Sequence, residues 1–219
     1  NRKRGALMEL NRLLLDTAGA AEAFSAESAA AARIAGRFSY VITLDADTEY
    51  IPGTVQRLVG AMHHPMNRPR MENGAQKGYA VLQPCMQTDA DTVRSAYARL
   101  MAGWGGMDGY PFSTSDFWQD VSGRGSFAGK GIYAVRPFAR ATDGVLNDDA
   151  ILSHDMIEGM LCGGGMLSDV AFYEGAPKNL SSDLGRTHRW IRGDWQVLPV
   201  IASKIAIAPR DRMRLIGNL

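Results

Sequence analysis

Two aspartates separated by one residue, Asp45 and Asp47, directly follow the apolar run 40–44. Ligands bind at the carboxyl ends of strands in open α/β sheets. Two carboxylates on such a turn can present oxygens to one Mg²⁺ or Mn²⁺ ion, whose remaining ligands are water and substrate phosphates. The alternative is an aspartate-rich turn in which one Asp caps the next helix. The pattern favours a divalent-cation site, and the capping alternative stays open.

A second carboxylate, Asp155, belongs to a Ser-His-Asp run at the start of an amphipathic segment. A carboxylate beside an acceptor hydroxyl can take its proton in the transition state, so Asp155 is a candidate general base. A plain helix cap by Ser153 or Asp155 explains the same residues equally well. We expect His154 to be a packed or surface histidine and assign it no metal.

The segment 186–195 holds three arginines and two tryptophans. Guanidinium groups suit phosphate, and tryptophan faces suit sugar surfaces or a cation. Helical spacing would put Arg186 and Arg189 on one side, with Trp190 beside them. The alternative is a surface helix whose tryptophans dock on the core.

Four glycines lie between positions 123 and 131, with Lys130 among them. Glycines allow a ligand to approach the backbone closely. The segment is not a P-loop, because Gly131 stands where Ser or Thr is required. A tight turn explains the glycines almost as well as a ligand site does.

Strands alternating with helices must position these residues, which predicts an α/β domain. Apolar and β-branched runs predict buried strands, and 3.6-residue periodicity predicts helices. The segments 67–78 and 103–131 are expected to be irregular. The predicted strands are 40–44, 79–82, 132–135 and 167–173, and the predicted helices begin near residues 5, 52, 92, 154 and 187.

The composition narrows the function classes. The 219 residues suffice for one domain, and 46% hydrophobic against 21% charged residues disfavours disorder. A net charge of +1 gives no reason to expect a nucleic-acid partner. Two cysteines cannot build a disulfide framework. Because the first residue is Asn, we expect the chain to be an excised segment. The longest apolar stretch, 197–208, is shorter than the roughly 20 residues of a membrane span, so we expect that this segment does not cross a membrane by itself.

Taken in order, these segments resemble the glycosyltransferase region of cyclic β-1,2-glucan synthases, a branch of the processive family-2-like glycosyltransferases. Residues 18–35, a candidate insertion, and 197–219, expected to lead to flanking membrane-associated helices, lie outside the matching stretches. Those stretches are 3–7, 40–48, 55–69, 78–84, 115–135, 151–159, 167–173 and 186–196.

The resemblance implies that residues 1–219 are a partial GT-A domain, an α/β fold whose mixed sheet is flanked by helices and lacks the first nucleoside-binding strands. It implies a UDP-glucose donor, a glucan acceptor and inversion at the anomeric carbon. By position, Asp45 and Asp47 match the metal–diphosphate motif, and Asp155 matches the catalytic base. Arg189 and Trp190 match the closing motif, which here opens with Arg186 where related polymerases have Gln. Lys3 is expected to reach the nucleotide, and Lys130, Arg186 or Arg189 to add hydrogen bonds to the leaving group.

The resemblance also implies a location at the bacterial inner membrane, with this domain on the cytoplasmic face. Alternatives remain: another β-glucan synthase of the same fold, or a non-catalytic carbohydrate-binding or regulatory module. A phosphate-releasing hydrolase is disfavoured, because Glu49 stands where a haloacid-dehalogenase motif usually wants Thr or Val. An EF-hand calcium loop is excluded, because Tyr50 occupies its glycine position.

Overall fold

The chain folds around a mixed four-stranded sheet. A computed structural model describes residues 3–15, 33–72, 75–101, 116–146, 151–203, 205, 207–217 and 219. Most of the candidate insertion 18–35 lies outside these residues. The strands stand in the order β1 (Tyr40–Thr43), β5 (Gly131–Ala134), β4 (Val81–Thr88) and β6 (Gly164–Glu174).

Strand directions place four chain segments at one edge of the sheet. β5 is antiparallel to both of its neighbours, and β4 is parallel to β6. The carboxyl ends of β1, β4 and β6 therefore lie at the same edge as the start of β5. The predicted α/β class, a mixed sheet flanked by helices, is confirmed, and it is consistent with a GT-A-like domain.

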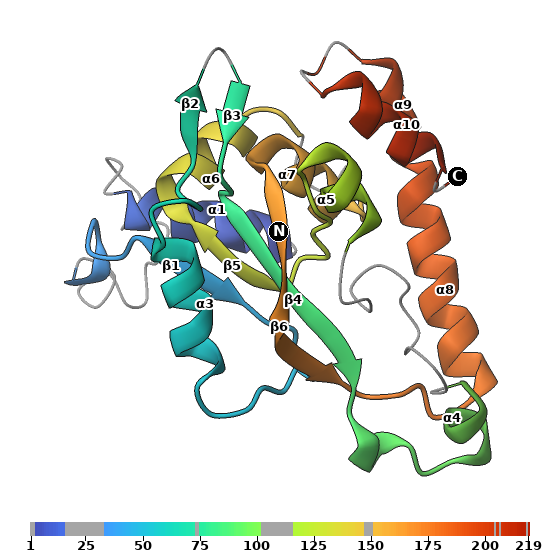
Figure 1. The fold of residues 1–219 in the computed structure, drawn as a ribbon. Helices are drawn as coiled ribbons and strands as arrows, with labels where there is room; N and C mark the ends of the chain where they lie inside the picture. Colours follow the sequence, from blue (N-terminus) through green and yellow to red (C-terminus); the bar gives the residue numbers. More distant parts are fainter. Residues whose placement is uncertain are drawn as a thin grey trace.

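Alternate side chains of β5 enter two separate apolar clusters, as the period of two in a strand requires. Ile132 packs with Leu58 and Met62 of α3 (Thr54–His63) on one face. Tyr133 packs on the other face with apolar residues of α1 (Lys3–Leu14), α6 (Val135–Thr142) and α7 (His154–Cys162). The sheet thus lies between α3 and the layer of α1, α6 and α7 (Figure 1).

The C-terminal helices add a third cluster against α7. Ile157 and Met160 of α7 pack with Val200 of α9 (Leu198–Ala202) and Leu215 of α10 (Pro209–Gly217). α8 (Leu180–Trp195) runs along one side of the molecule, from α4 (Ala96–Met101) toward α9 and α10 (Figure 1). Within the described residues, no helix is both long and apolar enough to cross a bilayer.

Several predicted boundaries are wrong for local reasons. β4 does not close at Pro84 but continues to Thr88, because the pairing with β6 shifts register between Pro84 and Cys85 and so accommodates the proline. The segment 67–78, expected to be irregular, contains a hairpin of β2 (Arg70–Glu72) and β3 (Ala75–Lys77). α4 begins at Ala96, because a 3₁₀ turn, η2 (Ala90–Thr92), precedes it.

Two helix starts were missed because their capping residues lie outside the apolar pattern. The segment 103–131, expected to be irregular, contains α5 (Phe117–Ser122), whose first amides donate to the Asp116 carboxylate; residues 102–115 lie outside the described part. α8 begins at Leu180 and not at Thr187, because Asn179 and Ser182 form a capping box there.

Candidate active site

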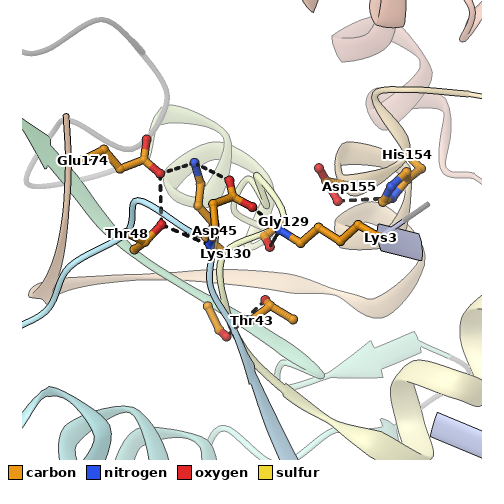
Figure 2. A network of polar contacts seen from close by, with 10 residues as sticks. Lys3, Thr43, Asp45, Thr48, Gly129, Lys130, His154, Asp155 and Glu174 are labelled. Atoms are coloured by element: carbon orange, nitrogen blue, oxygen red, sulfur yellow. Dashed lines mark hydrogen bonds and ion pairs between the residues drawn. The ribbon is translucent and has the colours of Figure 1, made fainter. Parts of the chain in front are cut away.

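The register of β1 and β5 brings Asp45 and Lys130 together. Thr43 pairs with Gly131, so Asp45 leaves β1 beside the residue that enters β5. Lys130 Nζ lies 3.4 Å from Asp45 Oδ2, and Lys3 Nζ donates to Asp45 Oδ1 at 2.5 Å (Figure 2). Two lysines from distant parts of the chain therefore hold the Asp45 carboxylate at the carboxyl edge of the sheet.

These ion pairs fix the charge of Asp45 and Lys130. Burial raises the pKa of Asp45, whereas the hydrogen bond from Lys3 and the positive charge of Lys130 lower it. The lowering effects together outweigh burial, so the pKa of Asp45 lies below its usual range. Burial lowers the pKa of Lys130, whereas the hydrogen bond and charge of Glu174 outweigh burial and raise it. Both side chains are thus charged at neutral pH.

Glu174, at the end of β6, is a site residue that the sequence analysis missed. Its carboxylate accepts a hydrogen bond from Lys130 Nζ and another, at 3.4 Å, from Thr48 Oγ1. Thr48 Oγ1 in turn accepts the Asp45 amide hydrogen at 3.1 Å. β6 therefore anchors both the lysine and the turn after β1. The position of Glu174 after the predicted strand 167–173 was the available indication.

The Asp155 carboxylate lies directly over Gly129. A Cβ built on Gly129 would lie 2.6 Å from Asp155 Cγ, so only glycine leaves room for the carboxylate. The backbone φ of Gly129, +77°, also favours glycine. Lys3 Nζ donates to the Gly129 carbonyl at 3.3 Å, which brings Asp155 into the same neighbourhood as Asp45 (Figure 2). The absence of a side chain at Gly129 therefore makes room for the Asp155 carboxylate.

The first turn of α7 holds Asp155 beside His154. Ser153 is the N-cap residue but makes no capping hydrogen bond with its side chain, which weakens the plain-cap interpretation. His154 Nδ1 lies 3.1 Å from Asp155 Oδ1. Burial raises the pKa of Asp155 above its ordinary value, and the positive charge of His154 offsets part of that shift. A carboxylate of raised pKa is a stronger base.

α8 presents Arg189 and Trp190 to the same site. A Cβ on Gly193 would overlap Ser153 Oγ, so α8 packs directly on the residue before α7. The contact is extended where Gln196 Oε1 accepts the Leu152 amide hydrogen at 2.9 Å. Trp190 is 41% exposed, so it is not docked in the core as the alternative interpretation required.

One cavity of about 490 Å³ joins these elements. It brings together five of the predicted site residues: Asp45, Lys130, Asp155, Arg189 and Trp190. Its lining also includes Ser153, the candidate cap, and residues that the sequence analysis did not name: Ser126, Phe127, Ala128, Leu152, Met156, Asp194, Arg214 and Gly217.

Three predicted residues lie beside the cavity and do not line it. Lys3 reaches it only through Asp45 and Gly129. Arg186 pairs with Asp183 at 3.1 Å and stacks 4.8 Å from the Trp190 ring centroid, so it supports the tryptophan. Asp47 is exposed on the turn after β1.

Two groups of carboxylates offer oxygen ligands. Asp45 and Asp47 share the turn at the cavity rim, and such hard oxygen donors suit Mg²⁺ or Mn²⁺. The ligand atoms of His154, Asp155 and Glu158 also lie within 4.8 Å of one another. In that second group Arg4 Nε pairs with Glu158 at 3.1 Å and His154 Nδ1 faces both carboxylates, so charge pairing already accounts for the cluster.

Comparison with known proteins places this site in a family context. No protein-family model matches the chain. Among curated proteins, the cyclic β-(1,2)-glucan synthase NdvB of Rhizobium meliloti (strain 1021) is 37% identical to it over 224 residues. This chain is a glucan synthase-related region. The resemblance inferred from the motifs is confirmed.

The alignment with the glucan synthase covers 100% of this chain and 8% of the relative. It therefore includes residues 18–35 and 197–219, which lie beyond the motifs that carry the resemblance. The chain therefore spans only a small part of the length of NdvB.

Proposed function

We propose that this region transfers glucose from UDP-glucose to a growing β-1,2-glucan, with inversion at the anomeric carbon. The observation that carries the proposal is the common cavity. It combines a half-buried carboxylate of raised pKa, Asp155, with a charged cluster around Asp45 and Lys130 and with an exposed tryptophan. A base, a diphosphate-binding edge and a sugar-binding face are the parts that glycosyl transfer needs.

Asp155 is the proposed general base. It removes the proton from the acceptor hydroxyl while that oxygen bonds to the anomeric carbon from the face opposite the diphosphate. The bond between the anomeric carbon and the diphosphate oxygen breaks, and UDP leaves with the electron pair. An α-linked donor therefore gives a β-linked product. The close approach of Asp155 to Gly129 supports this role, because the carboxylate is held near the sheet edge that carries Lys130.

The diphosphate is assigned to the charged edge. Lys130 and Arg189 line the cavity and can donate charge-assisted hydrogen bonds to phosphate oxygens. Asp47, with Asp45, would hold Mg²⁺ or Mn²⁺, which as a Lewis acid offsets the charge of a diphosphate leaving group. Trp190 is assigned to the acceptor sugar, whose C–H surface suits an exposed ring.

The test uses the full product of the gene that encodes this chain, in membranes of expressing cells. Incorporation of radiolabelled glucose from UDP-glucose is measured with Mg²⁺ or Mn²⁺ and after chelation by EDTA, and the product linkage is then determined. We expect metal-dependent β-1,2-glucan from the wild type and a loss of at least 100-fold in Asp155→Asn, since removal of a general base costs about 10²–10⁴-fold. Asp169→Asn, on β6 outside the cavity, is the matched control.

Three outcomes would overturn parts of the proposal. Full turnover in Asp155→Asn removes Asp155 from the base role. A different linkage points to another β-glucan synthase of the same fold. Glucan binding without consumption of any sugar nucleotide points to a carbohydrate-binding module. We also propose, from the resemblance alone, that the region acts at the cytoplasmic face of the bacterial inner membrane.

A further inference from the structure

A chain of charged side chains continues from Asp155 away from the cavity. His154 Nδ1 lies 3.1 Å from Asp155 Oδ1 and 3.2 Å from Glu158 Oε2. Glu158 Oε1 accepts a hydrogen bond at 3.1 Å from Nε of Arg4, which belongs to α1. Arg4 and Glu158 are 7% and 4% exposed, so this ion pair is buried. The mechanism proposed above uses only Asp155, and the purpose of the other three residues is unassigned.

Protonation of His154 would place a positive charge between the two carboxylates of this cluster. Asp155 and Glu158 contribute two negative charges, and Arg4 contributes one positive charge. Lys3 and Asp45, whose charges also act on Asp155, form a pair of their own at 2.5 Å. A buried charge needs a partner of opposite sign. An imidazolium between the two carboxylates supplies the missing charge.

We infer that His154 is a positioning residue for Asp155, held by the Glu158–Arg4 ion pair and providing the positive charge that keeps the Asp155 carboxylate ionised and oriented as the base. This inference rests on the proposed function of Asp155. His154 Nδ1 hydrogen-bonds with Glu158 Oε2, and its charge acts on Asp155 Oδ1 at 3.1 Å, which leaves Asp155 Oδ2 for the acceptor hydroxyl.

The electrostatics of the two groups agree with this arrangement. Burial lowers the pKa of His154, but the hydrogen bond that His154 donates to Glu158 and the charge of Asp155 outweigh burial and raise that pKa above its ordinary value. Burial raises the pKa of Asp155; His154 and Lys3 lower it, while Glu158 and Asp45 raise it. His154 is the largest factor that opposes burial, so its removal should make Asp155 harder to ionise.

A pair of variants separates this role from simple packing. In His154→Asn the amide nitrogen can occupy the position of Nδ1, so the donor is kept and the charge is lost. In His154→Lys the charge is kept. The control is His64→Asn, an exposed histidine at the end of α3. Each is made in the full gene product in membranes, and the pH dependence of kcat/KM is measured with UDP-glucose.

We expect the acid limb of kcat/KM to move upward by about one pH unit or more in His154→Asn, because a neighbouring opposite charge lowers a carboxyl pKa by about 1–3 units. His154→Lys and His64→Asn should keep the wild-type limb, and KM for UDP-glucose should stay within twofold in all three variants. An unmoved limb in His154→Asn overturns the inference, as does a raised limb in His154→Lys. If His154→Asn does not accumulate, the neutral variant His154→Gln replaces it, and an unmoved limb there overturns the inference in the same way.

The failure of this inference is distinguishable from failure of the proposed function. If Asp155→Asn is inactive while the acid limb does not move in His154→Asn, the base stands and the role of His154 is wrong. If Asp155→Asn is fully active, the proposed base is wrong and the assignment of His154 fails with it.

Discussion

Substitution of Gly129 by alanine should displace the proposed base, Asp155, and so lower activity far more than it lowers the stability of the protein. The new Cβ would lie 2.6–2.7 Å from all three atoms of the Asp155 carboxyl group, whereas ordinary contacts begin at 3.4 Å. The carboxylate is the end of a flexible side chain, so it can move away by about 1 Å at little energetic cost. A displacement of about 1 Å at a reacting centre can lower the rate by about 10²-fold.

Gly123→Ala is the matched control for this prediction. Gly123 has φ +71°, close to the +77° of Gly129, but a Cβ there meets nothing within 4 Å. Both variants should lose about 1–2 kcal/mol of stability, because alanine is disfavoured in the left-handed region. Only Gly129→Ala should also lose glucose incorporation.

The assay compares the two variants in the full gene product. Initial rates of glucose incorporation from UDP-glucose are measured in membranes, and thermal inactivation reports stability. We expect similar inactivation temperatures and a difference of about 100-fold in rate. Equal rates in Gly129→Ala and Gly123→Ala would refute the reasoning, because both glycines have a positive φ but only the Cβ at position 129 would meet the Asp155 carboxylate.

Three further outcomes follow from the geometry of the site. Gly193→Ala should lower activity, and should lower stability by about 1–3 kcal/mol, because its Cβ would overlap Ser153. The control, Gly185→Ala on the same helix, should be neutral or stabilising, because a Cβ there meets nothing within 4 Å. Equal thermal inactivation of the two variants would contradict this packing argument. Glu174→Gln should raise KM for UDP-glucose roughly tenfold, since Lys130 would lose its charged partner and a hydrogen bond to a charged group contributes about 1.5 kcal/mol or more. The control is Glu72→Gln, at an exposed position. An unchanged KM in Glu174→Gln would remove Glu174 from the site. Because burial raises the pKa of Asp155, and a base acts only when deprotonated, activity should fall as the pH drops through a value above the ordinary range of aspartate; a pH–rate profile whose acid limb lies within that range would contradict the burial argument.

Local sequence patterns were sufficient for the elements and for the residue types of the site. The apolar run after Ser39 predicted β1, and helical spacing from Pro52 onward predicted α3. Asp45, Asp155 and the Arg189–Trp190 pair could be proposed as site residues because each belongs to a short motif whose chemistry can be read without knowledge of the fold. Periodicity decides which face of an element is buried, and such information is local.

Tertiary structure alone decided how those motifs meet. Period and polarity do not specify which strands are neighbours, so the insertion of β5 between β1 and β4, which sets Lys130 beside Asp45, was not predictable. In the sequence, Glu174 only follows the predicted strand 167–173, and its contact with Lys130 is seen only in the folded chain. Arg4 and Glu158 are 154 positions apart, and only the packing of α1 near α7 makes them a buried pair behind His154. The sequence by itself determined which chemical groups this protein offers. Long-range packing decided which of them share a cavity, because contacts between distant segments depend on the whole fold and leave no local pattern.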